Sequence, residues 1–260
     1  MSGKKERGQN RDTRLLPTLV RIASLAMWGA PLTGPCNSYP GDRRGWRCRD
    51  LTIIYVRTYT TIMGRHSFRD IIITSGTQTV HQRGFATVGL REITAAAGVA
   101  QGSFTSHFAS KEEFGVEVLN HYSEQIREVI AQTLIDESRR PIERLRAYFD
   151  AITDLFAAVG WRYGCLAGNM GLEAAEHSEV IRQRLSEIFA EWTLPFVEVI
   201  REAQTLGEIR ADLDSEEASA ALLEAWHGAM LRMKIERTPA PLDRFKRLIF
   251  PALLGCSALS

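Results

Sequence analysis

The chain has 260 residues, of which 45% are hydrophobic and 24% are charged. This composition is typical of a globular protein with a buried core and excludes the fibrous and disordered classes. The net charge is +1, but residues 1–62 hold eleven Lys and Arg against four Asp and Glu, whereas residues 63–260 hold 21 against 27. No stretch of about 20 uninterrupted apolar residues occurs, so no transmembrane helix is predicted.

Residues 1–62 lack a sustained apolar period and are rich in proline, glycine and arginine. We therefore expect a poorly ordered N-terminal extension. Its basic start and the apolar run 15–30 suggest a secretion signal, but Pro17 and Arg21 interrupt that run. Since a complete domain follows Met63, a wrongly assigned translation start is the interpretation that we favour for these residues.

Four cysteines are far apart in the sequence: Cys36, Cys48, Cys165 and Cys256. They form no CxxC pair, and no histidine cluster has the spacing of metal ligands. The sequence therefore predicts neither a structural metal site nor a disulfide framework, and we expect a reducing cytoplasmic location.

From Phe68 onward the sequence predicts an all-α fold. A first helix is expected over about 66–82, with an inward face made of Phe68, Ile71, Ile72, Ser75 and Thr79. Two short helices follow, one around 90–97 and one around 103–108, separated by a turn at Gly98-Val99. Two brief helices joined by a glycine turn are typical of a helix-turn-helix.

The helices after this motif are longer. Ser110 and Glu113 predict a capping box at the start of a helix that runs to about Ser138, and Pro141 starts the next one. A long helix is expected over about 179–207, with a kink or break at Pro195. The last two helices are predicted over about 215–237 and 242–254.

The second short helix presents small polar groups of the kind that enter a DNA major groove. Phe104 and Phe108 are four residues apart and should face inward, which leaves Gln101, Ser103 and Thr105 outward with Ser106 and His107. This pattern favours DNA binding, although a purely structural helical corner is the alternative at this stage.

Residues 84–114, GFATVGLREITAAAGVAQGSFTSHFASKEEF, resemble the DNA-binding head of the TetR family of transcriptional regulators. The resemblance implies a DNA-binding domain over 63–126 and an effector-binding and dimerisation domain over 127–260. It also implies that the segment 101–107 is the recognition helix and that Thr87 and Lys111 contact phosphates. The DNA-binding residues predicted in this way are Thr87, Gln101, Gly102, Ser103, Thr105, Ser106, His107 and Lys111.

One position of this head departs from the family pattern, because Thr105 stands where members usually carry a tyrosine. Cations are also few in the head, so a single head should bind DNA weakly. We therefore expect a homodimer on a near-palindromic operator. A helical dimer that no longer reads DNA is the alternative that these two features leave open.

Two later stretches, 163–169 and 231–237, resemble TetR-type regulators that respond to electrophiles and small unsaturated acids. This narrower resemblance makes Cys165 the candidate sensor. On its own, a single cysteine in an apolar helix is usually a small core residue. Cys165, however, follows Gly164 at a predicted helix start, and Lys234 is a candidate partner that would lower the pKa of the thiol.

Aromatic residues of the body, Trp161, Tyr163, Trp192 and Trp226, are candidates for the wall of an effector cavity or for ordinary core. Asn169 and His227 are the polar groups expected in that wall, whereas His121 and His177 should be solvated. The apolar faces of the last two long helices predict a four-helix bundle across the dimer axis.

Together these observations predict a cytoplasmic, cofactor-free, homodimeric repressor that a small-molecule effector or an electrophile releases from its operator. No membrane contact is expected. A Cys165-dependent enzyme is a further alternative, but the sequence shows neither a histidine base nor an orienting carboxylate at recognisable positions.

Overall fold

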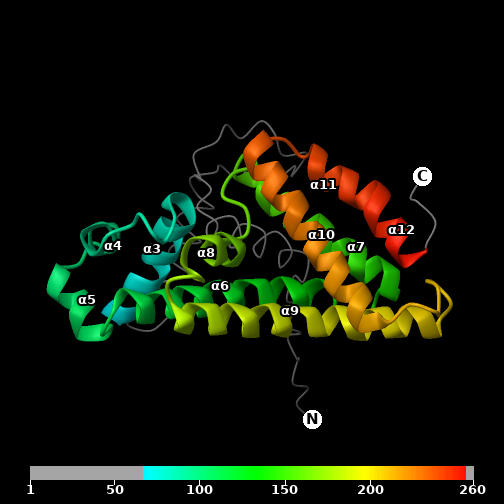
Figure 1. Ribbon diagram of the computed structural model, residues 1–260, viewed down its shortest axis with the longest axis horizontal. Coiled ribbons are helices and arrows are strands. Elements are labelled where there is room, and N and C mark those ends of the chain that lie inside the picture. The colour runs from blue at the N-terminus through cyan, green and yellow to red at the C-terminus, as the bar shows by residue number, and fades with distance from the viewer. Residues whose placement is uncertain (1–66, 256–260) are drawn as a thin grey trace, which may run out of the picture.

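A computed structural model describes residues 67–255, and every regular element in this range is a helix (Figure 1). The Met63 start, Cys36, Cys48 and Cys256 lie outside the described residues, as does the extension 1–62. The all-α prediction is confirmed. The elements are α3 (Phe68–Arg83), α4 (Leu90–Ala97), α5 (Gln101–His107), α6 (Lys111–Thr133), α7 (Pro141–Ala158), α8 (Leu166–Ala174), α9 (Glu179–Thr205), α10 (Ser215–Glu236), α11 (Ala240–Arg244), η2 (Phe245–Ile249) and α12 (Phe250–Leu254).

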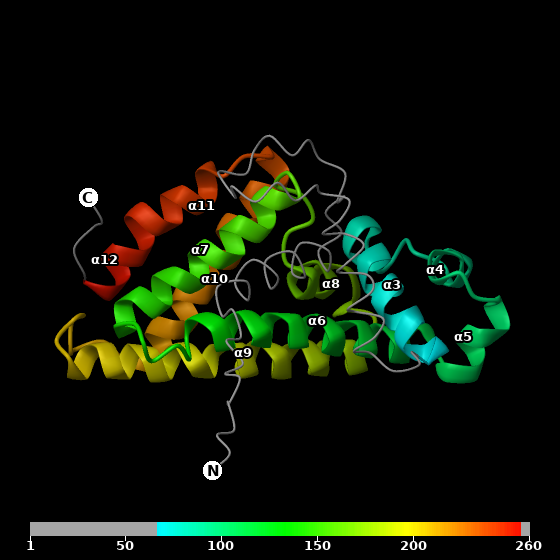
Figure 2. The ribbon, with the colours of Figure 1, turned by 180° about the vertical axis from the view of Figure 1, so that it is seen from behind.

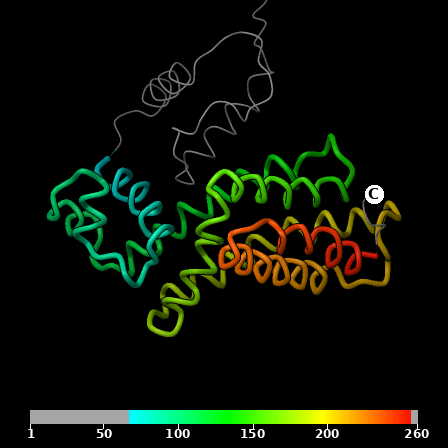
Figure 3. The backbone as a smooth tube through the Cα atoms, turned by 90° about the horizontal axis from the view of Figure 1, so that it is seen from above, coloured from blue at the N-terminus to red at the C-terminus, as the bar shows by residue number. Residues whose placement is uncertain are grey.

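Helices α3, α4 and α5 form a lobe at one end of the molecule, the head (Figure 3). The remaining helices form the body, in which α6 and α9 lie along each other beneath α7 and α10 (Figures 1 and 2). Helix α8 lies between the head and the body, where it packs on α6 and α9. The first helix of the body, α6, also packs on α3 and so joins the two parts.

The inward face of α3 differs from the predicted one. Phe68 is 61% exposed, and the buried side is formed by Ile72, Ile73, Gly76, Thr77, Val80 and His81. The reason is the close approach of α6: a Cβ atom on Gly76 would lie 2.4 Å from Cζ of Phe114. Because only a glycine admits the Phe114 ring, Gly76 fixes which side of α3 faces α6.

Helix α6 begins at the predicted cap but ends earlier than expected. The Ser110 hydroxyl accepts a hydrogen bond from the Glu113 N–H at 3.0 Å, while the Glu113 carboxylate accepts the Ala109 N–H at 2.7 Å instead of that of Ser110. The helix ends at Thr133 rather than at Ser138. Asp136 accepts the backbone N–H of Ser138 at 3.2 Å, and this local bond competes with continued helix.

Helix α9 continues through Pro195, so of the two predicted outcomes, a kink or a break, the break does not occur. Proline removes the hydrogen bond to the carbonyl four residues earlier. Buried side chains on both sides of the proline, including Trp192, Phe196 and Val199, pack against neighbouring helices and offset that loss. The expected last helix, 242–254, begins at Ala240 and contains a π-helical turn, η2, over Phe245–Ile249.

Candidate functional site

Helix α5 has the surface that a recognition helix requires. Gln101, Gly102, Thr105 and Ser106 are exposed, and Ser103 and His107 are partly exposed. The opposite side is held by Phe104 and Phe108, whose rings lie 5.3 and 5.4 Å from that of Phe114 in α6. The helix thus presents a polar face from a rigid aromatic base, and Gly98, with φ +66°, forms the turn before it.

The cations of the head are largely engaged within the protein. Arg69 pairs with Glu117 at 3.0 Å, and Arg83 pairs with Glu92 at 2.6 Å. Lys111 lies 4.8 Å from the centre of the Phe85 ring and donates to the Ala86 carbonyl at 3.3 Å. Phosphate binding would therefore replace existing contacts, which limits the electrostatic contribution of one head.

The two candidate threonines of the head also have internal partners for their hydroxyls. Thr87 Oγ1 donates to the Arg83 carbonyl at 2.6 Å, and Thr105 Oγ1 donates to the Gly102 carbonyl at 3.1 Å. Both side chains are exposed. Each hydroxyl oxygen keeps lone pairs, but a donated bond to phosphate would need a rotation of the side chain.

Cys165 is the N-cap of α8, at the end of a tightly wound loop. Gly160, Trp161, Tyr163 and Gly164 all have positive φ values between 60° and 71°. This loop brings the chain from the end of α7 back into the body, and the Cys165 Sγ accepts the Gly168 N–H at 3.5 Å. The helix start predicted at Cys165 is confirmed.

The ionisable neighbour of Cys165 is His227 of α10, which lies in the same cavity wall and favours the thiolate form. The Leu223 carbonyl accepts a bond from His227 Nδ1 at 2.8 Å, so Nδ1 carries a proton and Nε2 is the ring nitrogen left for the thiol. Burial raises the pKa of Cys165, but His227, the Gly168 N–H and the Tyr122 hydroxyl together bring it below its usual value. Contact with Cys165 raises the pKa of His227 despite its burial.

Lys234 does not pair with Cys165, and the prediction that it does is wrong. Its Nζ donates to Asn169 Oδ1 at 3.0 Å, and Asn169 Nδ2 in turn donates to the Tyr163 carbonyl at 2.7 Å. The lysine stem lies 3.3 Å from the position of a Cβ on Gly164. Lys234 and Asn169 therefore hold in place the loop that carries Cys165, and Lys234 is not the group that lowers the pKa of the thiol.

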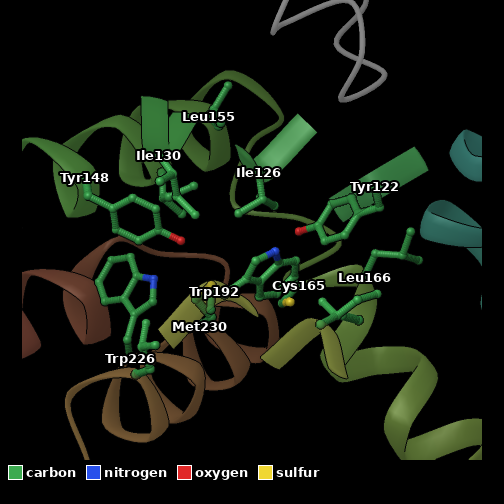
Figure 4. Packing of buried hydrophobic residues seen from close by; sticks show 14 of the residues in the cluster. Tyr122, Ile126, Ile130, Tyr148, Leu155, Cys165, Leu166, Trp192, Trp226 and Met230 are labelled. Carbon is green, nitrogen blue, oxygen red and sulfur yellow. The ribbon is translucent and has the colours of Figure 1, made fainter. Parts of the chain in front are cut away.

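The sulfur faces a cavity between α6, α7, α9 and α10 (Figure 4). The cavity is small: its volume is about 20 Å³, enough for about one water molecule, so a larger ligand enters only if side chains of the wall move. No lysine, arginine, aspartate or glutamate is among the described residues that line it. The lining residues are Tyr122, Ile126, Tyr148, Ile152, Phe156, Cys165, Trp192, Leu223, Trp226, His227 and Met230.

The sequence predicted part of this wall. Trp192, Trp226 and His227 line the cavity, whereas Trp161, Tyr163 and Asn169 lie outside its lining. Tyr122 and Tyr148 are lining residues that the sequence reasoning missed, although both fall on apolar helix stripes. His121 is partly buried and bonded to Gln125 Nε2 at 3.1 Å, so the prediction that it is solvated is wrong, while His177 is exposed as expected.

Two hydrogen bonds join the head to the segment that carries Cys165, and we call this pair of contacts the seam. His81 at the end of α3 donates from Nε2 to the Gly164 carbonyl at 2.7 Å. Glu173 of α8 accepts the Ala86 N–H at 2.8 Å. Burial lowers the pKa of His81 to about 4, so its ring is neutral at pH 7. The seam thus ties both ends of the Cys165–α8 segment to the head.

A small three-helix head with an exposed, polar short helix, carried on a helical body with an internal cavity, is typical of DNA-binding regulators. Comparisons with known proteins agree with this class. Residues 72–118 match the family model described as bacterial regulatory proteins, tetR family. Residues 141–249 match the model described as tetracyclin repressor-like, C-terminal domain.

Among known proteins, the HTH-type transcriptional repressor DhaR of Mycobacterium sp. (strain GP1) is 42% identical over 192 residues, which is 74% of this chain and 95% of that protein. A crystal structure of regulatory protein TetR from Rhodobacter sphaeroides is 34% identical, with a TM-score of 0.66 over 68% of this chain and 94% of that one. The reduced form of Escherichia coli NemR is 25% identical, with a TM-score of 0.60 over 69% and 94%.

The chain belongs to the TetR family. It is a DNA-binding transcriptional regulator, and the match to the tetR family model includes α4 and α5. Within the described residues, no helix is long and apolar enough to cross a membrane. The same residues hold no group of three or more His, Cys, Asp or Glu side chains placed to bind a metal ion.

Proposed function

We propose that this protein is a cytoplasmic homodimeric repressor that leaves its operator when an electrophile modifies Cys165. The observation that carries the proposal is the Cys165–His227 pair in the wall of a cavity. A thiolate, not a thiol, is the nucleophile, and a histidine that takes the thiol proton supplies it near neutral pH. A merely structural cysteine would need no such partner.

The seam offers a route from this thiol to the DNA. A group added to the Cys165 sulfur needs more room than the small cavity offers. We infer that the adjacent loop before α8 moves to make this room. That loop carries Gly164, whose carbonyl holds His81 of α3, and α8 carries Glu173, which holds Ala86. We infer that modification weakens the seam and changes the angle between head and body.

In the dimer, a small change in the angle of each head is enough to release the operator. Two recognition helices must fit successive major grooves, so a change of head angle in each subunit changes their spacing. We assign the dimer interface to exposed apolar residues of the last helices, which include Leu231, Ile235, Leu248 and Ile249. These side chains extend the apolar face on which a four-helix bundle would form.

In the recognition helix we assign operator contacts to Gln101, Gly102, Ser103, Thr105, Ser106 and His107, with Thr87 and Lys111 on the flanking phosphates. The exposure of this face and its aromatic base support the assignment. The enzyme alternative gains a histidine beside Cys165, but His227 Nδ1 is bonded to a helix carbonyl and not to an orienting carboxylate. We therefore favour a single modification event over turnover.

The test uses the full-length protein and labelled DNA from upstream of its own gene. Operator binding is followed by fluorescence anisotropy before and after treatment with methyl vinyl ketone, and adducts are located by mass spectrometry. We expect wild-type protein to release DNA with an adduct on Cys165. The Cys165→Ser variant should bind DNA normally and stay bound after treatment.

The chain offers a matched control, because three further cysteines lie elsewhere. A variant with Cys36, Cys48 and Cys256 all replaced by serine keeps only the proposed sensor. It should respond like the wild type. A response that survives in Cys165→Ser, or that disappears in the triple variant, would place sensing at another thiol and overturn the proposal.

A further inference from the structure

The cavity contains a hydrogen-bond donor that has no acceptor. Trp226 is 1% exposed, and its indole Nε1 is fully buried with no hydrogen-bond partner among the described residues. The other indole of the wall differs, since Trp192 Nε1 donates to Ser123 Oγ at 3.2 Å. Buried N–H groups almost always have a partner, so an unpaired one in a cavity wall points to an acceptor that a ligand supplies.

The unpaired N–H and the thiol belong to the same cavity. Figure 4 shows the Trp226 nitrogen on the edge of the ring that faces the Tyr148 hydroxyl and the interior of the cluster, with Cys165 on the other side of that interior. A small molecule in the cavity would therefore meet a donor at one side and a nucleophile at the other. This arrangement orients a reactive ligand as well as enclosing it.

We infer that the effector is a small neutral α,β-unsaturated carbonyl compound whose oxygen accepts the Trp226 N–H while its β-carbon meets the Cys165 sulfur. The inference rests on the proposed function and specifies the ligand class. A carboxylate is disfavoured because no Lys or Arg is among the described lining residues, and His227, the histidine among them, is engaged by the Cys165 thiol. A buried anion without a partner is costly, whereas a ketone or aldehyde oxygen needs only a donor.

The reaction balances without an oxidant or reductant. His227 takes the proton of the Cys165 thiol, and the sulfur forms a bond to the β-carbon as the C=C π bond breaks. The electron pair moves onto the carbonyl oxygen, where the Trp226 N–H stabilises the developing negative charge. The proton returns from His227 to the α-carbon, so the product is the saturated thioether carbonyl.

The experiment compares rates of Cys165 modification in the background that keeps only this cysteine, followed by mass spectrometry. Methyl vinyl ketone carries the acceptor oxygen, and iodoethane alkylates a thiolate without one. Each rate is divided by the rate of the same reagent with glutathione. We expect Trp226→Phe to slow the ketone by about tenfold or more while changing the iodoethane rate less than about twofold.

Trp192→Phe is the matched control, because it removes an indole N–H from the same wall that already has a protein acceptor. It should not alter the ratio of the ketone rate to the iodoethane rate. Equal slowing of both reagents in Trp226→Phe, or no slowing, would overturn the inference. Acrylate, an unsaturated carboxylate, is a third reagent. If its rate with wild-type protein, divided by its rate with glutathione, exceeds that of the ketone, the inference of a neutral ligand is also overturned. DNA release is measured separately, so adduct formation without release refutes the proposed function alone.

Discussion

The His81 side chain makes the stability of this protein depend on pH in a way that can be calculated. His81 is buried at the seam and bonded to the Gly164 carbonyl, and desolvation by burial is the main cause that lowers its pKa from 6.5 to about 4. In the unfolded chain the ring has its ordinary pKa. Between pH 6.5 and 4 the unfolded state therefore binds more protons, and the folded state loses stability as the pH falls through that window.

The size of the effect follows from the two pKa values. One unit of difference corresponds to about 1.4 kcal/mol, so the full contribution is about 3 kcal/mol once the pH is below both values. At pH 5, where the unfolded ring is almost fully protonated and the folded ring is almost neutral, the loss is about 2 kcal/mol relative to pH 7.5. The free energy of unfolding is thus free of this loss only above about pH 6.5.

The assay is urea denaturation of wild type and His81→Gln at pH 7.5 and pH 5.0, at one protein concentration because dimers unfold in a concentration-dependent way. Glutamine keeps an N–H for the Gly164 carbonyl but does not titrate. Other groups whose pKa is shifted, such as His121 and Glu179, contribute equally to both proteins. We expect the variant to lose about 2 kcal/mol less than wild type on acidification. An equal loss would refute a buried, neutral His81.

Three further predictions address the thiol, the seam and the packing of the head. His227→Asn should slow alkylation of Cys165 by about tenfold or more at pH 7, because burial without the histidine raises the thiol pKa; the readout is adduct formation against pH. Glu173→Ala should leave modification unchanged but weaken its effect on operator affinity, as measured by anisotropy, and an unaltered response would exclude this contact from signalling. Gly76→Ala should destabilise the fold by about 1–3 kcal/mol in urea because its Cβ would overlap the Phe114 ring, while Gly102→Ala, whose Cβ meets nothing, should not.

The head was predictable from the sequence because its signals are local. The glycine turn at Gly98, the cap at Ser110 and the four-residue spacing of Phe104 and Phe108 each depend on residues within one or two helical turns. The side of α3 that faces inward was not predictable in this way. It depends on Phe114, which is distant in sequence and meets Gly76 only after α6 has packed.

The surroundings of Cys165 were only half predictable for the same reason. The position of Cys165 at a helix N-terminus can be read from Gly164 and the apolar residues that follow, but the histidine that lowers its pKa comes from α10. Lys234 and His227 are both on that helix, and only the three-dimensional path of the loop before Cys165 decides between them. The loop turns so that Lys234 meets Asn169 and His227 meets the sulfur.

Because Cys165 lies next to the seam, the loss of two weak hydrogen bonds there would change operator affinity strongly. A hydrogen bond contributes about 1 kcal/mol net, and somewhat more when one partner is charged, as Glu173 is. If an adduct on Cys165 breaks both bonds of the seam, each subunit loses about 2 kcal/mol of its preference for one head angle, and a dimer loses about 4 kcal/mol. Since 1.4 kcal/mol is tenfold in an equilibrium constant, this is close to a thousandfold change in operator affinity. A monomer with the same seam would change its affinity by only about thirtyfold. In the proposed mechanism the coupling through His81 and Glu173 therefore gains its strength from dimerisation, and strong release requires an adduct on Cys165 of both subunits.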